Sequence, residues 1–173
     1  MRQLLILVIL ILFSSNSYSQ KENALIQDGL EKQEEGNLKG AIISYSKAIE
    51  INPKNFWVYS FRGSAKFDLN DFIGAILDYS KSISLNPTRT GCSDKGEIYS
   101  NRGLTKASLK DYRGALIDFS KAIELDNKNG QYYYNRGFSK RSLKNINGAC
   151  LDWSKSGELG LSNAYNAIKD YCN

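Results

Sequence analysis

The chain has 173 residues, 42% of them hydrophobic, with 23 Lys and Arg against 18 Asp and Glu, a formal charge of +5. This length suits one domain or a short array of repeats, and the composition is typical of a folded protein. The sequence contains no His, which removes the commonest general base and the most frequent metal ligand. Charges of both signs alternate along the expected helices and form no basic patch of the kind that binds phosphates. We therefore expect no metal, no cofactor and no nucleic-acid partner.

Residues 1–19 have the organisation of a signal peptide. Arg2 gives a short basic start, residues 4–13 are an unbroken run of ten apolar residues, and residues 14–20 are small or polar. A membrane-spanning helix needs about 20 apolar residues, so this run is more typical of a secretory signal. Small residues at Ser17 and Ser19 predict cleavage after Ser19, which leaves Gln20 as the new N-terminus. The protein would then be periplasmic or secreted, with no membrane span; a buried N-terminal helix or an uncleaved anchor is the alternative.

The rest of the chain repeats one unit four times. A Gly recurs at spacings of 34, 40 and 34 residues; a Gly-Ala pair follows it, with the Ala twelve residues after the first Gly, and an aromatic residue comes four residues later. Small residues at the Gly and Ala places allow two antiparallel helices to approach closely, and the ring fills the space one turn further on. The three places are occupied by Gly29, Ala41 and Tyr45; Gly63, Ala75 and Tyr79; Gly103, Ala115 and Phe119; and Gly137, Ala149 and Trp153.

Turn residues divide each unit into a helical hairpin. The predicted helices are 22–35, 39–51, 56–69, 72–85, 96–109, 112–125, 130–143 and 146–158. Residues 162–171 predict a closing helix that places Tyr165, Ile168 and Tyr171 inward. Residues 90–95, which lengthen the second spacing to 40 residues, predict a loop that bulges from one edge.

The 34-residue period, with Gly, Ala, aromatic and Pro at these places, resembles the tetratricopeptide-repeat (TPR) family over residues 22–161. The resemblance implies an all-α, right-handed α-solenoid of four helix-turn-helix repeats (22–55, 56–89, 96–129 and 130–161), closed by a C-terminal capping helix in residues 162–173. The sequence departs from the family at Lys66, Lys106 and Lys140, where the family favours Tyr. We expect these Lys residues to weaken individual packing contacts without changing the fold.

The resemblance also implies a non-enzymatic scaffold that binds another protein or a peptide in a concave groove, lined by the first helix of each hairpin. We expect a monomer. The alternative surface for ligand binding is the convex side, which is built from Ser, Lys and Asp. The alternative for Trp57 and Phe61 is packing against neighbouring repeats. Helical spacing gives the groove residues as Trp57, Phe61, Ser64, Asn101, Leu104, Tyr134, Asn135 and Phe138.

One specialisation of the family is a Lys, Asn and Arg clamp for the terminal carboxylate of heat-shock chaperones. Asn101 lies in a Tyr-Ser-Asn-Arg string like that of the clamp, but Ser60, Ser64, Gln131 and Asn135 occupy the places of its other members. We therefore expect no carboxylate clamp. A secreted hydrolase is the alternative function, because residues 156–165 resemble a cysteine-rich family of secreted repeat proteins with suggested enzymatic activity, although they supply no catalytic constellation. A wall-associated or membrane-associated structural role is a further alternative.

Two pairings are predicted inside the repeats. Three Arg residues, each just before the repeat Gly, should pair with an Asp in the second helix of the same hairpin: Arg62 with Asp78, Arg102 with Asp118, and Arg136 with Asp152. Cys150 and Cys172 lie equidistant from the turn at residues 160–161 between antiparallel helices, which predicts a disulfide and leaves Cys92 as the odd thiol. Two buried thiols are the alternative.

Overall fold

The computed structural model describes the backbone of residues 2–85 and 92–172, and the side chains of residues 18–85 and 95–172. The described residues form nine α-helices and no strand. Their bounds are α1 Arg2–Glu34, α2 Leu38–Ile51, α3 Phe56–Asp68, α4 Phe72–Leu85, α5 Cys92–Ser108, α6 Tyr112–Leu125, α7 Gly130–Ser142, α8 Ile146–Glu158 and α9 Asn163–Tyr171.

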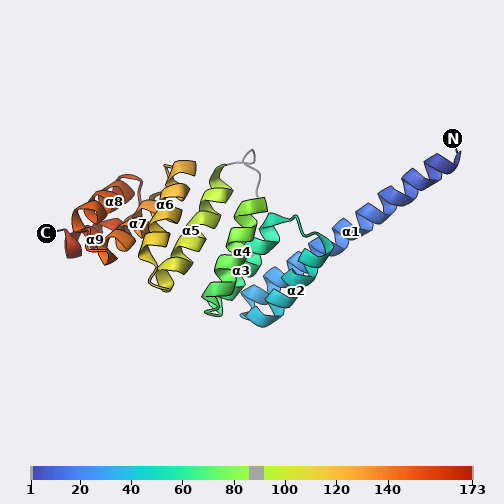
Figure 1. The fold of residues 1–173 in the computed structure, drawn as a ribbon, viewed down its shortest axis with the longest axis horizontal. Helices are drawn as coiled ribbons and strands as arrows, with labels where there is room; N and C mark the ends of the chain where they lie inside the picture. Colours follow the sequence, from blue (N-terminus) through green and yellow to red (C-terminus); the bar gives the residue numbers. More distant parts are fainter. Residues whose placement is uncertain (1, 86–91, 173) are drawn as a thin grey trace.

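The helices pack as antiparallel pairs, α1 with α2, α3 with α4, α5 with α6 and α7 with α8, and each pair stacks on the next. α9 packs on α8 and closes the C-terminal end, while the N-terminal part of α1 extends away from the stack (Figure 1). The first helices also touch one another, α1 with α3, α3 with α5 and α5 with α7. The pairs therefore form one elongated array in which the first helices share a side.

Each hairpin core is an aromatic ring packed onto a Gly. Phe119 on α6 is fully buried, and a Cβ placed on Gly103 of α5 would lie only 2.9 Å from its ring. Trp153 on α8 is fully buried in the same way against Gly137 of α7. Any larger residue at the Gly would push the two helices apart, so the recurrent Gly is required by the close approach.

The second recurrent Gly has a different role, which concerns the helix start. The Asp111 side chain caps α6 and accepts a hydrogen bond from the Gly114 backbone N–H at 2.9 Å. A Cβ on Gly114 would collide with the Asp111 carboxylate. The equivalent caps of α2 and α8 are Asn37 and Asn145. The Gly of the Gly-Ala pair thus makes room for the N-cap side chain.

The structure differs from the sequence prediction at three places. α1 begins at Arg2, so the expected signal segment and the first repeat helix are one continuous helix. α5 begins at Cys92, so residues 92–95 of the expected loop belong to the helix, while residues 86–91 lie outside the described ones. On α9 the buried residues are Ala164 and Ala167, whereas Tyr165 is 61% exposed. The prediction that Tyr165 faces inward is therefore wrong, because Ala164 and Ala167 occupy the buried face of α9.

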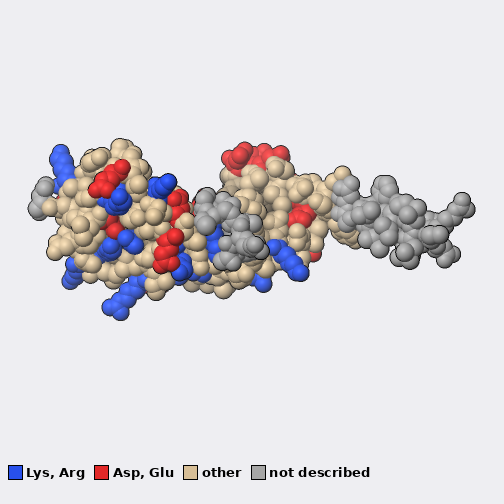
Figure 2. Space-filling model, turned by 90° about the horizontal axis from the view of Figure 1, so that it is seen from above, with Lys and Arg blue, Asp and Glu red and all other residues tan. Residues whose placement is uncertain are grey.

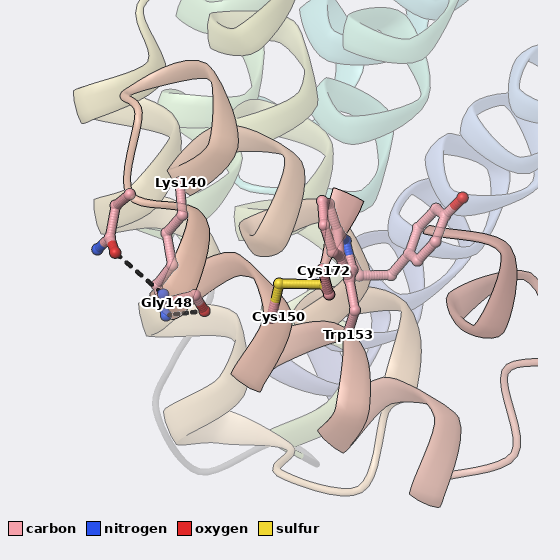
Figure 3. Close-up of a disulfide and its surroundings, with 7 residues drawn as sticks. Lys140, Gly148, Cys150, Trp153 and Cys172 are labelled. Carbon is pink, nitrogen blue, oxygen red and sulfur yellow. Dashed lines mark hydrogen bonds between the residues drawn. A yellow bond between two sulfur atoms is a disulfide. The ribbon is translucent and has the colours of Figure 1, made fainter. Parts of the chain in front are cut away.

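The predicted disulfide between Cys150 and Cys172 is confirmed. It joins α8 to the end of α9 across a Cα–Cα distance of 5.8 Å, with Trp153 beside it (Figure 3). Both Cys residues pack against the cluster formed by Ala149, Trp153 and Ala167. The bond fixes the closing helix to the last repeat. The side chain of Cys92, predicted as the odd thiol, lies outside the described residues.

Candidate functional site

A groove runs along the side of the array that the first helices share. It consists of four neighbouring hollows, one between α1 and α3, one between α3 and α5, and two between α5 and α7, of which the most polar has a volume of about 420 Å³. Ser64 and Asp68 line the first two hollows, Leu104 lines the last three, and Asn135 lines the last two. The shared residues make the hollows continuous. We call this the groove.

Six of the eight predicted groove residues line it: Phe61, Ser64, Asn101, Leu104, Asn135 and Phe138. Trp57 and Tyr134 are not among the residues that line these four hollows. The Trp57 ring stacks on Phe61 at a centroid distance of 6.2 Å, and the Tyr134 carbonyl accepts a hydrogen bond from the Trp153 indole N–H at 3.2 Å. Phe61 also packs against the core of the first repeat. Phe61 therefore serves both interpretations, since it packs between repeats and borders the groove.

Sequence reasoning missed the groove residues that lie one turn further along the first helices or outside them. Asp68 follows Ser64 by one turn of α3, and Ser142 follows Phe138 by one turn of α7. Helical spacing alone could have found these two. The loop residues Asp126 and Asn129 line the third hollow because the α6–α7 connection folds against α5. The groove residues not predicted are Leu30, Gln33, Glu34, Phe67, Asp68, Tyr79, Glu97, Ser100, Ala107, Tyr112, Phe119, Asp126, Asn129, Gln131, Tyr132, Ser139 and Ser142.

On a different face of the first helices, the predicted Arg–Asp pairs are confirmed in all three repeats. Arg102 donates from Nε and Nη2 to the two carboxylate oxygens of Asp118, at 2.9 and 2.7 Å, and from Nη1 to Ser80 of the preceding hairpin at 3.0 Å. Its guanidinium carbon lies 5.4 Å from the centre of the Tyr99 ring. The pairs Arg62–Asp78 and Arg136–Asp152 have the same geometry, and the hydrogen bonds that Arg136 donates to Asp152 raise the pKa of Arg136 above its ordinary value.

Each Arg–Asp pair has a third member, a Lys, that was not predicted from the sequence; we call the three side chains a cluster. Lys106 lies one turn beyond Arg102, and its Nζ is 2.7 Å from Asp118 Oδ2. Lys66 and Lys140 pair in the same way with Asp78 and Asp152. From the sequence these Lys residues were treated only as departures that weaken packing contacts, and the structure shows that each also forms an ion pair. Each cluster then holds two cations around one carboxylate and ties its hairpin to the one before.

The first repeat reverses this arrangement. Asp28 occupies the Arg place on α1, Ser44 occupies the Asp place on α2, and Asp28 accepts hydrogen bonds from Ser44 and from Lys32 Nζ, the latter at 2.6 Å. These hydrogen bonds lower the pKa of Asp28 below its ordinary value. In the first repeat the carboxylate therefore lies on the first helix of the hairpin instead of the second, and it still pairs with a Lys.

The second helices carry a feature that corrects the expected composition of the convex surface. Ile43, Leu77, Ile117 and Leu151 stand at the same place of each repeat, two residues after the buried Ala, and are 56–73% exposed. We call them the outer stripe. A surface of Ser, Lys and Asp was expected, but an aliphatic residue recurs on it in every repeat. On the face that Figure 2 shows, Lys and Arg are scattered and do not merge into one basic patch.

Comparison with known proteins agrees with this geometry. The TPR repeat family matches residues 29–69, and the Tetratricopeptide repeat family matches residues 96–129. The chain is a TPR protein. No curated protein matches its sequence.

Solved structures resemble this TPR protein over most of its length. The crystal structure of MamA protein aligns with a TM-score of 0.76 and 22% identity, over 87% of this chain and 80% of that one. The first TPR of Spaghetti (RPAP3), bound to the HSP90 peptide SRMEEVD, aligns with a TM-score of 0.67 and 26% identity, over 73% and 95% of the two chains. The Arabidopsis OM64 TPR domain gives 0.62 and 22%, over 73% and 97%. These similarities show the fold, that of a scaffold family that is typically non-enzymatic and binds peptides or proteins.

Among the residues whose side chains are described, the TPR array holds no group of three or more His, Cys, Asp or Glu residues that could bind a metal ion. Over the same residues, no helix is long and apolar enough to cross a membrane.

Proposed function

We propose that this TPR protein is a non-enzymatic scaffold of the cell envelope or the extracellular space that binds an extended peptide of a partner protein in the groove. The observation that carries the proposal is the continuity of the groove, to which α1, α3, α5 and α7 all contribute. A peptide of several residues could therefore contact successive repeats, as solenoid ligands do.

The polar residues of the groove suit a peptide backbone. Asn101 on α5 and Asn135 on α7 occupy the same place of successive repeats, two residues before the repeat Gly, and both line the hollow between these helices. A carboxamide offers both a donor and an acceptor, so it can pair with a peptide N–H and C=O at once. Leu104 and Phe138 supply the apolar surface beside them. The first TPR of Spaghetti, similar in fold, was solved with a bound peptide, which supports peptide binding here.

The test is capture of a partner through the groove. Leu104→Glu with Phe138→Ala should abolish capture of a partner from an envelope extract, because they place a charge in the apolar hollow and remove its ring. The control variant is Leu77→Glu, which places the same charge on the outer stripe and should retain capture. Equal capture by the groove variant and the wild type, with both folded by circular dichroism, would overturn the proposal.

Export is part of the same proposal. The first buried residue among those described is Glu22, whose carboxylate accepts hydrogen bonds from Asn52 at 3.0 Å and from Asn55 at 2.6 Å. Among the residues whose side chains are described, packing of the array thus begins just after the proposed cleavage site behind Ser19, and we expect cleavage to leave the folded array intact. N-terminal sequencing of the protein from a periplasmic fraction should give Gln20; an intact Met1 in a cytoplasmic fraction would contradict export.

A further inference from the structure

The charges of the groove are all of one sign. Among its described lining residues, the ionisable side chains that are charged at neutral pH are Glu34, Asp68, Glu97 and Asp126, and none is Lys or Arg. The chain as a whole carries five more basic than acidic residues. An acidic groove in a basic protein is the opposite of what its composition alone would give.

The carboxylates lie in two groups along the array. Glu34 and Asp68 border the hollow between α1 and α3, and Glu97 and Asp126 border the polar hollow between α5 and α7. Glu34, Asp68 and Glu97 are exposed, and Asp126 is half-buried at the end of α6. All four can therefore meet the charges of a ligand while they keep partial contact with water.

An apolar hollow adjoins the second group. Leu104 and Phe138 line it together with the ring of Phe119, and it contains little polar surface. A ligand that fills the whole groove would need an apolar side chain in this hollow. It would need one cationic group at the hollow between α1 and α3 and another at the polar hollow between α5 and α7.

We propose that the groove is specific for a cationic extended segment of the partner protein, with Lys or Arg residues facing the two carboxylate groups and an apolar residue in the Leu104–Phe138 hollow. This inference rests on the proposed function and names the chemistry of its ligand. Opposite charges also accelerate encounter, so association should slow as salt is added. The peptide SRMEEVD, bound by the first TPR of Spaghetti, carries three acidic residues against one Arg. Its carboxylates would face the carboxylates of this groove.

Selection from a library of random 12-residue peptides on the immobilised protein tests the inference. Selected peptides should be enriched in Lys and Arg, and their binding should be lost in a Leu104→Asn, Phe138→Ala variant, which adds no carboxylate to the groove. Groove-dependent peptides that are neutral or acidic would overturn the charge specificity and leave the proposed function standing. Absence of any groove-dependent peptide would overturn both.

A matched pair of variants then isolates the groove charges. The groove variant is Glu34→Gln, Asp68→Asn, Glu97→Gln and Asp126→Asn, and the control carries Glu50→Gln, Glu124→Gln, Glu158→Gln and Asp170→Asn outside the groove. Both gain the same net charge and keep side chains of similar size. Affinity for a selected cationic peptide should fall about tenfold or more in the groove variant and less than about twofold in the control. An equal fall in both would mean that net charge alone attracts the peptide, which would overturn the inference.

Discussion

Removal of the Asp118 carboxylate tests how the repeats are held together. Asp118 is fully buried, accepts two hydrogen bonds from Arg102 at 2.9 and 2.7 Å, and forms an ion pair with Lys106 at 2.7 Å. Asp118→Ala leaves two cations whose side chains are only 18% and 20% exposed, without the anion that balances them. Loss of one member of a buried ion pair costs about 3–5 kcal/mol, and we expect a loss of that size in the free energy of unfolding.

Arg102→Ala should cost less, about 2–3 kcal/mol, because Lys106 still pairs with Asp118. The double variant should lose less than the sum of the two single losses, by about 1–3 kcal/mol, since it leaves no buried carboxylate and only one cation. Urea unfolding followed by circular dichroism gives the free energies and the m-values.

The control is Glu124→Ala. The Glu124 side chain is 62% exposed and forms an ion pair with Lys121. An exposed pair contributes little, so this change should cost less than about 1 kcal/mol. Additive losses for Arg102 and Asp118, within about 0.5 kcal/mol, would show that the two side chains do not act together and would refute the reasoning.

Four further predictions concern packing, ionisation and the disulfide. Gly103→Ala should lower the free energy of unfolding by about 1–3 kcal/mol in urea unfolding, because its Cβ meets a buried ring at 2.9 Å; an unchanged midpoint would contradict this. Burial raises the pKa of Tyr45 from 10.0 to about 12. As the pH rises, the unfolded chain therefore loses the Tyr45 proton before the folded chain does. The contribution of Tyr45 to the free energy of unfolding is fully present below pH 10 and should fall by about 1.4 kcal/mol at pH 11. Tyr45→Phe should remove this pH-dependent loss. Leu77→Lys should change the free energy of unfolding by less than about 0.5 kcal/mol because Leu77 is 66% exposed; a larger loss would indicate that a second copy of the chain covers the outer stripe. Reduction of the Cys150–Cys172 disulfide should lower stability by about 3 kcal/mol, whereas the double Ser variant should not respond to reductant.

The sequence determined the repeating unit. The Gly, Ala and aromatic places are local in a helical hairpin, so a 34-residue period was enough to predict the helix pairs to within a few residues, apart from the starts of α1 and α5. The Arg–Asp pairs and the disulfide were predictable for the same reason, since partners equidistant from a turn between antiparallel helices face each other.

Tertiary structure decided everything that depends on how one hairpin lies against the next. The bond from Arg102 to Ser80 crosses between hairpins, and no spacing within a repeat predicts it. The acidic groove likewise joins Glu34 of the first repeat to Asp126 of the third. Their charges belong to one surface only because the first helices stack side by side, which the sequence of a single repeat does not encode.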